Sequence, residues 1–309
     1  MSREYHLFQV DAFTTVPFSG NPAGVVLDAE GLDASRMQMI ARELGNPETA
    51  FVFGPSKDDH DVAIRFFSPR TEVPICGHAT IAAHYVLAHL GRSAEGLIRQ
   101  HSPAGIREVI VSRRRDGDWA IRMRQGRPAF EPPLRHAIVA RILDAVCAGA
   151  AALAPYPVQI VSTGHSKVMI GLRGIDALSS LRPDPDALTA ISRDIGSNGF
   201  HFFVLTNGAS QPLTECRMFA PAVGILEDPV TGNANGPLGA YLVRNNLVAH
   251  NGHELTFWSS QGVAMGRPGR VRVSVRIENG EPTAVEIGER AVIVFEGRLV
   301  ACGETLACN

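Results

Sequence analysis

The chain has 309 residues, of which 45% are hydrophobic and 19% are charged, and its formal net charge is −2. This is an ordinary globular composition, with enough apolar residues for two cores. A nucleic-acid-binding protein needs a basic face, and the near-neutral charge balance argues against one, so we expect no nucleic-acid partner.

The cysteines and the apolar segments exclude further classes of protein. The five cysteines are scattered and contain no C-x-x-C pair, so they predict neither a disulfide framework nor a zinc cage. The start of the chain contains no apolar segment of signal-peptide length, and the most apolar stretch, 137–155, is too short to cross a bilayer. We therefore expect a cytoplasmic protein with no membrane partner. The cysteines are Cys76, Cys147, Cys216, Cys302 and Cys308.

The first part of the chain predicts a helix, two strands and a second helix. The first helical pattern ends at Gly45, a usual helix stop. Segments rich in β-branched residues predict strands, and Asp116-Gly117 is a typical hairpin turn between two of them. The predicted elements are helix 34–44, strands 49–53 and 62–67, helix 79–90, and strands 108–112 and 120–124.

The second part of the chain repeats this order. Residues 126–149 are interpreted as a connector that holds one helix, 134–148. Gly196 then stops a helix, and Asn279-Gly280 is a hairpin turn. The predicted elements are helix 186–195, strands 200–205 and 215–219, helix 234–245, and strands 270–276 and 291–295, the last of which the repeat assigns to the second copy.

Three short segments recur in the same order. IARELG, from residue 40, returns as ISRDIG from residue 191, at an offset of 151. RFFSP, from residue 65, returns as RMFAP from residue 217, at an offset of 152. PICGHA, from residue 74, returns as PVTGNA from residue 229, at an offset of 155. The ordered repeats predict an α+β fold of two pseudo-symmetric domains, residues 1–125 and 150–289.

The third repeated segment indicates where a ligand binds. Gly77 and Gly232 each precede an apolar helix, and glycine allows close approach of a ligand to the backbone. The first turn of a helix offers free N–H groups and the positive end of the helix dipole. Two such helix starts, brought together by a pseudo-two-fold axis, would hold a small carboxylate. The alternative is two ordinary glycine-opened helices.

The two copies differ in their ionisable groups. A racemase on a symmetric scaffold requires one acid–base group on each face of the stereocentre, and here the second thiol is absent. A proton shuttle on one face requires a single base, with neighbours that orient it. The unlike pairs are Cys76 and Thr231, His78 and Asn233, and Glu48 and Gly199.

Glu48 is the leading candidate for the base. It follows a helix stop and precedes an apolar strand, so we expect partial burial, which suits a carboxyl group to proton exchange near neutral pH. His78 stands at a helix start, where it would donate to the substrate. Asp228 precedes the second glycine segment. The alternatives are a surface glutamate, a capping histidine and a turn-forming aspartate.

Five segments of the chain resemble successive signatures of the PhzF-like isomerases, and among these the uncharacterised bacterial members. They are VDAFTTVPFSGNPAGVV, LGNPETAFVF, VPICGHATIAAHYVL, STGHSKVMI and EDPVTGNANGPLGAYL, and they cover nearly the whole chain. The family is named for a phenazine-biosynthesis enzyme that isomerises trans-2,3-dihydro-3-hydroxyanthranilate. The resemblance implies the diaminopimelate epimerase fold, in which each domain is a barrel-like sheet around a central helix and the active site lies between the domains.

The resemblance also implies that no metal or organic cofactor is used, that the protein is a homodimer, and that residues 290–309 complete the sheet of the first domain. Glu48 falls on the acid–base glutamate of the family, His78 on the histidine of its G-H motif, and Asp228 on the aspartate of its D-P-x-T-G motif.

Four further positions carry over as substrate-binding residues. Gly77 and Gly232 fall on glycines whose surroundings bind substrate. Asn233 stands where the phenazine enzyme has serine, so the resemblance does not extend to that substrate. Cys76 matches the thiol position of diaminopimelate epimerase, but the partner thiol is missing.

The sequence thus predicts a cofactor-independent isomerase that moves a proton within a small carboxylate-bearing metabolite, with Glu48 as the acid–base group. Two alternatives stay open: an amino-acid epimerase or racemase, and a non-catalytic protein of the same fold that binds a small ligand.

Overall fold

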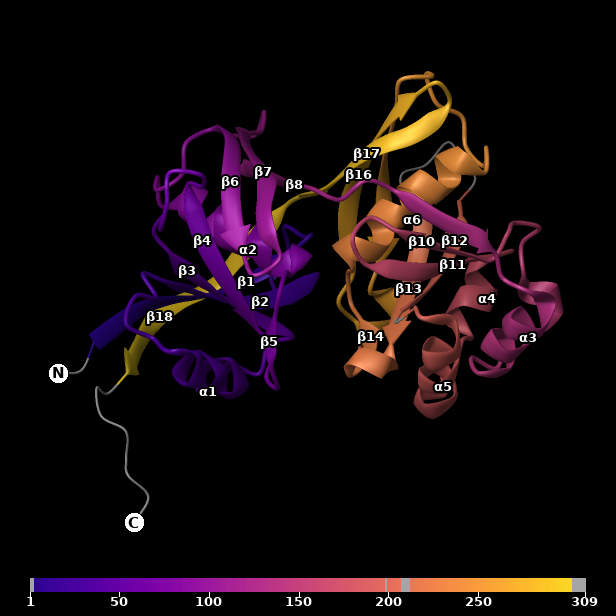
Figure 1. The fold of residues 1–309 in the computed structure, drawn as a ribbon, viewed down its shortest axis with the longest axis horizontal. Coiled ribbons are helices and arrows are strands. Elements are labelled where there is room, and N and C mark those ends of the chain that lie inside the picture. The colour runs from indigo at the N-terminus through magenta and orange to yellow at the C-terminus, as the bar shows by residue number, and fades with distance from the viewer. Residues whose placement is uncertain (1–2, 198, 207–211, 302–309) are drawn as a thin grey trace, which may run out of the picture. The chain divides into compact units, whose positions relative to one another are not determined.

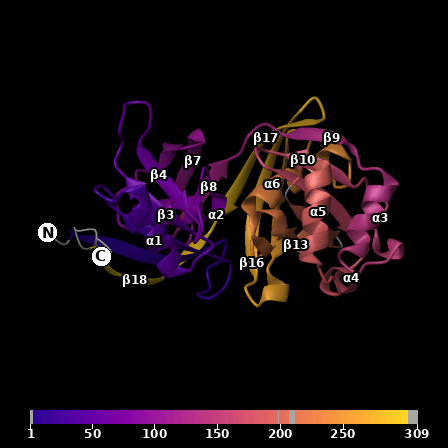
Figure 2. The same ribbon diagram turned by 60° about the horizontal axis from the view of Figure 1, so that its bottom comes forward.

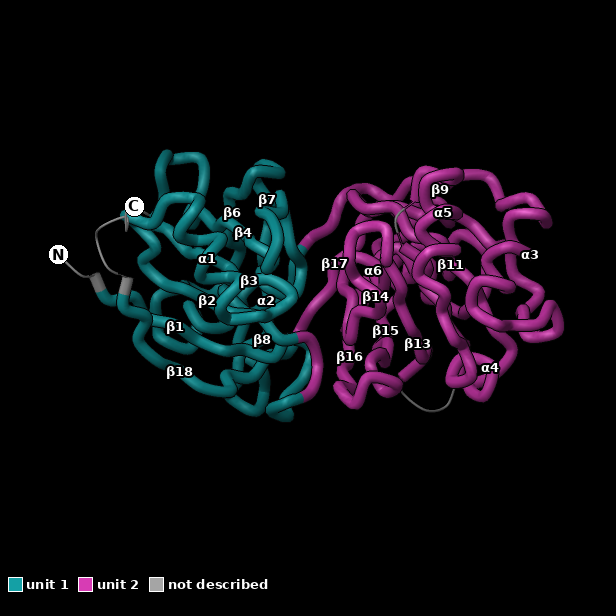
Figure 3. The backbone as a smooth tube through the Cα atoms, turned by 90° about the horizontal axis from the view of Figure 1, so that it is seen from below, with its two compact units in different colours: residues 1–18, 22–123, 290–309 teal, residues 19–21, 124–289 magenta. Residues whose placement is uncertain are grey.

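The structure is a computed structural model that describes residues 3–197, 199–206 and 212–301. The chain forms two compact units (Figure 3). Unit 1 comprises Met1–Phe18, Pro22–Met123 and Arg290–Asn309, and unit 2 comprises Ser19–Asn21 and Arg124–Glu289. Within the described ranges, no helix combines the length and apolar character needed to cross a membrane.

Unit 1 is a mixed sheet with a helix packed inside it (Figure 1). Its strands pair in the order β18–β1–β2–β3–β4–β6–β7–β8, and β5 pairs with β4. The elements are β1 (Arg3–Ala12), β2 (Asn21–Leu27), α1 (Ala34–Leu44), β3 (Glu48–Phe53), β4 (Val62–Phe67), β5 (Glu72–Val73), α2 (Gly77–His89), β6 (Gly96–Ser102), β7 (Gly105–Arg113), β8 (Trp119–Arg124) and β18 (Ala291–Ala301).

The helix α2 has no polar face. Every residue from His78 to Ala88 is buried, and the helix packs on β1, β3 and β18. A helix that is apolar on all sides is stable only where other elements cover it completely. The strands of unit 1 provide this cover, so α2 is the central helix of that unit.

Unit 2 repeats the arrangement with additional helices. Its strands pair in the order β9–β10–β11–β12–β13–β15–β16–β17, and β14 pairs with β13. The elements are β9 (Ala129–Pro133), α3 (His136–Asp144), η1 (Ala150–Ala152), β10 (Gln159–Ser162), β11 (Ser166–Leu172), α4 (Ile175–Ser179), α5 (Pro185–Ile195), β12 (Phe200–Leu205), β13 (Thr214–Ala220), η2 (Pro221–Val223), β14 (Ile225–Asp228), α6 (Gly232–Arg244), β15 (Glu254–Gln261), η3 (Val263–Met265), β16 (Gly269–Glu278) and β17 (Glu281–Glu289).

The strands β10–β12 of unit 2 carry apolar residues on both faces, because helices cover both sides (Figure 2). Alternate residues such as Ile170 and Phe202 pack against Leu143 of α3 and Leu188 of α5. The helix α6 packs on β10 and β11, and on β16 and β17. Successive residues of a strand point to opposite faces, so these apolar strands carry two layers of core.

The two units share the order and direction of their strands. The pairs β2–β3 and β11–β12 are both parallel, and the antiparallel and parallel pairs that follow also match. Gly45 and Gly196 end equivalent helices with φ of 66° in each. Gly77 and Gly232 begin equivalent helices of 13 residues each. These glycine pairs are the ones that the sequence repeat predicts.

Two assignments from the sequence differ from the structure. The repeat placed strand 291–295 in the second copy, but β18 belongs to unit 1 and pairs antiparallel with β1. Residues 126–149 are not a bare connector, because they contain β9 and α3 of unit 2. In strand order β18 and β9 take the same place. One edge strand therefore comes from the end of the chain in unit 1 and from the middle of the chain in unit 2.

The cysteines of the described residues form no disulfide. Cys76 and Cys216 are buried free thiols and Cys147 is an exposed one. Cys302 and Cys308 lie outside the described residues.

A matched pair of leucine substitutions tests the core of unit 2. Leu188→Ala removes a fully buried side chain and should lower the free energy of unfolding by about 2–5 kcal/mol. Leu226→Ala removes a side chain that is 64% exposed and should change it by less than about 0.5 kcal/mol. Urea denaturation followed by circular dichroism measures both. Equal losses would contradict the burial assigned to Leu188.

Candidate active site

Three polar side chains meet at the start of α2, and we call Glu48, Cys76 and His78 the unit 1 cluster. Glu48 is the first residue of β3, Cys76 is the N-cap of α2, and His78 lies in its first turn. The Glu48 Oε2 atom lies 3.3 Å from His78 Nε2 and 3.5 Å from Cys76 Sγ. The Cys76 Sγ atom lies 3.4 Å from His78 Nδ1. Unit 1 thus gathers three of the predicted site residues.

Burial sets the charge of this cluster. The side chains of Glu48 and His78 are 14% and 9% exposed, so the expected partial burial of Glu48 is confirmed. Burial lowers the pKa of His78 to about 4, although a hydrogen bond to the Pro22 carbonyl opposes the shift. The imidazole is therefore neutral at neutral pH. Glu48 thus lies beside a neutral imidazole and contacts the sulfur atom of Cys76.

The unit 1 cluster also has the donor types of a metal site. One ligand atom from each of its three residues lies within 4.8 Å of the others. Carboxylate oxygen, thiolate sulfur and imidazole nitrogen all bind zinc, and three protein ligands are typical of a catalytic zinc site. In the structure the same atoms contact one another. The residues of the unit 1 cluster therefore fit a metal ion as well as a metal-free acid–base site.

A second group of polar side chains lies at the start of α6, and we call Asn21, Asp228 and Thr231 the unit 2 cluster. Asp228 is the last residue of β14, and Thr231 is the N-cap of α6. Asp228 accepts a hydrogen bond of 2.8 Å from Asn21 Nδ2 and one of 2.5 Å from Thr231 Oγ1. The Asn21 amide also donates to the Val230 carbonyl, at 2.8 Å. Asp228 is thus the acceptor of a buried network.

The Asp228 carboxyl group has a raised pKa. Burial raises its pKa to about 6, while the hydrogen bonds from Thr231 and Asn21 and the charge of Lys167 act in the opposite direction. A carboxyl group whose pKa lies this close to neutrality can exist in both protonation states near physiological pH. This property is typical of functional sites as well as of buried ion pairs.

Gly77 differs from the expectation in its backbone conformation. The φ of Gly77 lies outside the left-handed region, and a Cβ atom there would meet nothing within 4 Å. Its backbone conformation therefore does not require glycine. The first turn of α2 still has N–H groups without helical acceptors, because Thr80 N is the donor that reaches back to the Cys76 carbonyl. Open space above Gly77 leaves these donors accessible.

The first turn of α6 contains an unsatisfied acceptor. The Oδ1 atom of Asn233 is buried and accepts no hydrogen bond from any described residue. The carbonyl oxygen of the neighbouring Gly232 accepts a hydrogen bond of 3.1 Å from Gln125 Nε2. A buried acceptor without a donor costs free energy, so it marks a place where a ligand or water donates.

Sequence reasoning missed three polar residues of unit 2. Asn21 was not assigned a role, although it lies in a segment that carries the family resemblance. Lys167 is 5% exposed, and burial lowers its pKa to about 8, an effect that the charge of Asp228 opposes. His201 is fully buried, and burial together with the charge of Lys167 lowers its pKa to about 3. A lysine near the start of β11, which is otherwise apolar after it, was the available signal for Lys167.

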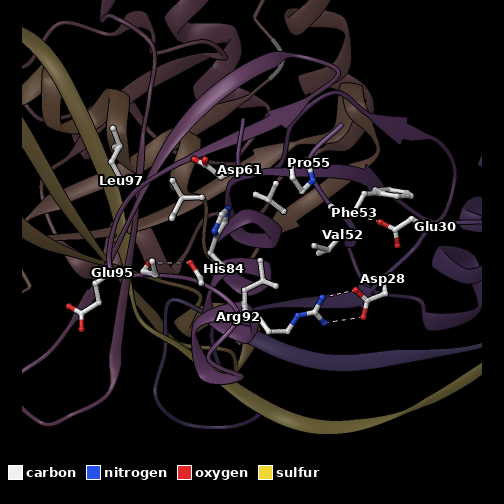
Figure 4. A pocket seen from close by; sticks show the side chains of 16 residues that line it. Asp28, Glu30, Val52, Phe53, Pro55, Asp61, His84, Arg92, Glu95 and Leu97 are labelled. Carbon is white, nitrogen blue, oxygen red and sulfur yellow. Dashed lines mark hydrogen bonds and ion pairs between the residues drawn. The ribbon is translucent and has the colours of Figure 1, made fainter. Parts of the chain in front are cut away.

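A separate pocket of about 570 Å³ lies within unit 1 (Figure 4). His84, Val52 and Leu87 are among its lining residues, and none of the unit 1 cluster is. Arg92 holds Asp28 at this pocket through two hydrogen bonds, of 2.6 and 3.0 Å. This pocket is therefore separate from the candidate site.

Known proteins are similar to this chain over most of its length. Residues 10–297 match the family described as phenazine biosynthesis-like protein. The chain is 49% identical over 290 residues to the uncharacterized isomerase YddE of Escherichia coli strain K12, which covers 94% of this chain and 96% of that protein. It is 31% identical over 289 residues to the trans-2,3-dihydro-3-hydroxyanthranilate isomerase of Pseudomonas aeruginosa, covering 94% and 97%.

The fold is also that of a solved structure. A phenazine biosynthesis protein of the PhzF family from Bacillus anthracis superposes with a TM-score of 0.87 at 30% identity. The match covers 96% of this chain and 99% of that protein. The α+β fold predicted by resemblance is therefore confirmed.

The raised pKa of Asp228 predicts a pH-dependent stability. Its folded pKa of about 6 exceeds the ordinary value of 3.8, so the folded state holds a proton that the unfolded state has lost. This contribution is fully present below pH 3.8 and is lost as the pH rises through about 6. Between these limits the free energy of unfolding of the natural protein should fall by about 2–3 kcal/mol relative to Asp228→Asn.

Urea titrations at pH 4 and pH 6 measure this difference. The exposed substitution Asp144→Asn controls for the loss of one carboxyl group at the surface. Parallel pH profiles for the natural protein and Asp228→Asn would show that Asp228 is not desolvated as described.

Proposed function

Since this chain belongs to the family of phenazine biosynthesis-like proteins and is an isomerase, we propose that it moves a proton within a small carboxylate-bearing metabolite. Glu48 takes the proton from one carbon and returns it to another. His78 and Asp228 contribute to the same reaction, and no metal or organic cofactor takes part. By the resemblance, we further propose that the active form is a homodimer.

The observation that carries this proposal is the position of Glu48. It is a carboxylate with little exposure, next to the first turn of a buried helix and in contact with a thiol and a neutral imidazole. A general base must be within reach of the substrate and must not be neutralised by a permanent cation. The neutral imidazole of His78 therefore places no cation beside Glu48.

The two helix starts support the proposed class of substrate. The first turns of α2 and α6 have N–H groups without helical acceptors, and such groups bind carboxylates and other anions. Gly77, Cys76, Gly232 and Asn233 border these turns and are the proposed substrate-binding residues. Asn233 differs from the serine of the phenazine enzyme, so we propose a carboxylate other than the one named for the Pseudomonas aeruginosa relative.

A two-thiol racemase is less well supported. In unit 2 the position equivalent to Cys76 is Thr231, and its hydroxyl group donates to Asp228. A threonine hydroxyl held in this way is no substitute for the second thiol. The proposal of a single acid–base group follows from this difference.

Glu48→Gln tests the proposed base. The amide keeps the size of the side chain and removes its basicity, so the rate should fall by about 10²–10⁴. A panel of small cyclic carboxylates provides the candidate substrates, and trans-2,3-dihydro-3-hydroxyanthranilate is the comparison compound. Mass spectrometry follows the entry of solvent deuterium into the product.

Cys76→Ser is the matched control within the same cluster. It should retain most of the activity, because no second thiol completes a two-cysteine mechanism. Full deuterium exchange by Glu48→Gln, with none by Cys76→Ser, would overturn the proposal in favour of a racemase. Binding without exchange by the natural protein would favour the non-catalytic alternative.

Removal of metal tests the donor set of the unit 1 cluster. The enzyme dialysed against EDTA should turn over at an unchanged rate, because Glu48 is proposed to move the proton without a metal. Elemental analysis before and after dialysis checks that metal has been removed. Activity that disappears on dialysis and returns with Zn²⁺ would show that Glu48, Cys76 and His78 are metal ligands.

A further inference from the structure

Equivalent strand pairs in the two units carry their ionisable side chains on opposite partners. In unit 1, β2 and β3 are parallel, and Ala23 lies opposite Glu48. In unit 2, β11 and β12 are parallel, and Val168 lies opposite Phe200. One residue earlier in the same register, Lys167 lies opposite Gly199. The charged side chain is on the second strand in unit 1 and on the first strand in unit 2.

The side chain of Lys167 occupies the space above Gly199. A Cβ atom built on Gly199 would lie 2.4 Å from Lys167 Cδ, 2.7 Å from Cε and 3.4 Å from Nζ. The Val168 N–H group donates to the Gly199 carbonyl at 2.8 Å, which fixes the two strands at this point. Lys167 therefore fills the space of the side chain that Gly199 lacks, at the position where unit 1 has Glu48.

The surroundings of Lys167 do not use its full capacity to donate. The side chain is 5% exposed, and among the described residues its Nζ atom donates to the Ser166 carbonyl, at 3.1 Å. A lysine ammonium group has three N–H donors, so two remain for a ligand or water. Burying an ammonium group with incomplete hydrogen bonding costs free energy of folding. A buried lysine that costs free energy of folding is therefore a candidate for a functional role.

Charge balance with Asp228 does not account for Lys167 by itself. The charge of Asp228 acts on Lys167 through space. However, Asp228 Oδ1 accepts from Asn21, and Asp228 Oδ2 accepts from Thr231. Both carboxyl oxygens of Asp228 thus already accept hydrogen bonds from neutral groups. The ammonium group stands near the carboxylate without donating to it.

We propose that Lys167 binds the carboxylate of the small metabolite on which the enzyme acts and stabilises its negative charge. This inference rests on the proposed function, because it assigns the substrate group that unit 2 recognises. An ammonium group in a site of low dielectric constant stabilises an anion more strongly than it would in water. Lys167 is thus a substrate-binding residue, opposite in charge to Glu48 and located at the equivalent place.

The experiment compares a carboxylate with its uncharged amide. 2-Aminobenzoate and 2-aminobenzamide have the same ring and differ in the group that Lys167 is proposed to bind. Isothermal titration calorimetry at pH 7 should show that the natural protein binds the carboxylate about 10- to 100-fold more tightly, as expected for a hydrogen bond to a charged group. Lys167→Met should reduce this preference by about 10-fold or more, and the helix first turns should provide what remains.

Gly199→Ala tests the same residue without removing its charge. The added methyl group would lie 2.4 Å from Lys167 Cδ, so the side chain must move, and the preference for the carboxylate should fall. Gly149→Ala is the control, because its Cβ atom would meet nothing within 4 Å. Thermal melts show that each variant is folded, and Lys167→Met should be at least as stable as the natural protein.

Two results would overturn the assignment. One is a preference for the carboxylate that survives undiminished in both Lys167→Met and Gly199→Ala. The other is a natural protein that does not prefer the carboxylate to the amide. Glu48→Gln should keep the preference while losing deuterium exchange, so a failure of this inference is distinguishable from a failure of the proposed function.

Discussion

Each unit encloses a helix that is buried on almost every side, and this constraint decides where polar chemistry can lie. Along α2 and α6 nearly every residue is buried, so the walls of the helices offer little room for charged groups. Their first turns are different, because their N–H groups have no helical acceptor. The unit 1 and unit 2 clusters both lie at these first turns. The central helix thus fixes the position of the candidate site in each unit.

The sequence predicted the features that depend on neighbours along the chain. The helices that end at Gly45 and Gly196 were found because a left-handed glycine is a local signal. The assignment of Glu48, Cys76 and His78 to the candidate site followed from two family motifs. Lys167 was not predicted, because its position beside Gly199 depends on the pairing of two strands about thirty residues apart. The partner of β18 likewise depends on topology, which the repeat alone assigned incorrectly.

The two units have the same backbone arrangement but different polar side chains at their helix starts. Strand order, strand direction and helix ends agree between them. The side chains at the helix starts differ, with a carboxylate, a thiol and an imidazole in unit 1 and a carboxylate, a hydroxyl and an amide in unit 2. Packing requires the apolar framework to be conserved between the copies, whereas the polar positions are free to diverge. The difference leaves a buried cluster of carboxyl, thiol and imidazole groups in unit 1 and a buried lysine in unit 2.

The pairing of β1 with β18 has a consequence for synthesis of the protein. These strands pair antiparallel from Arg3 opposite Ala301 to Ala12 opposite Ala291, with one register shift, so the first described strand pairs with the last. A growing chain usually completes its N-terminal domain first. Here the main segment of unit 2, Arg124–Glu289, leaves the ribosome before β18 is made. One edge of β1 still lacks its partner at that stage. Unit 1 therefore completes its sheet after unit 2, and the open edge of β1 is exposed to other chains until β18 has been synthesised.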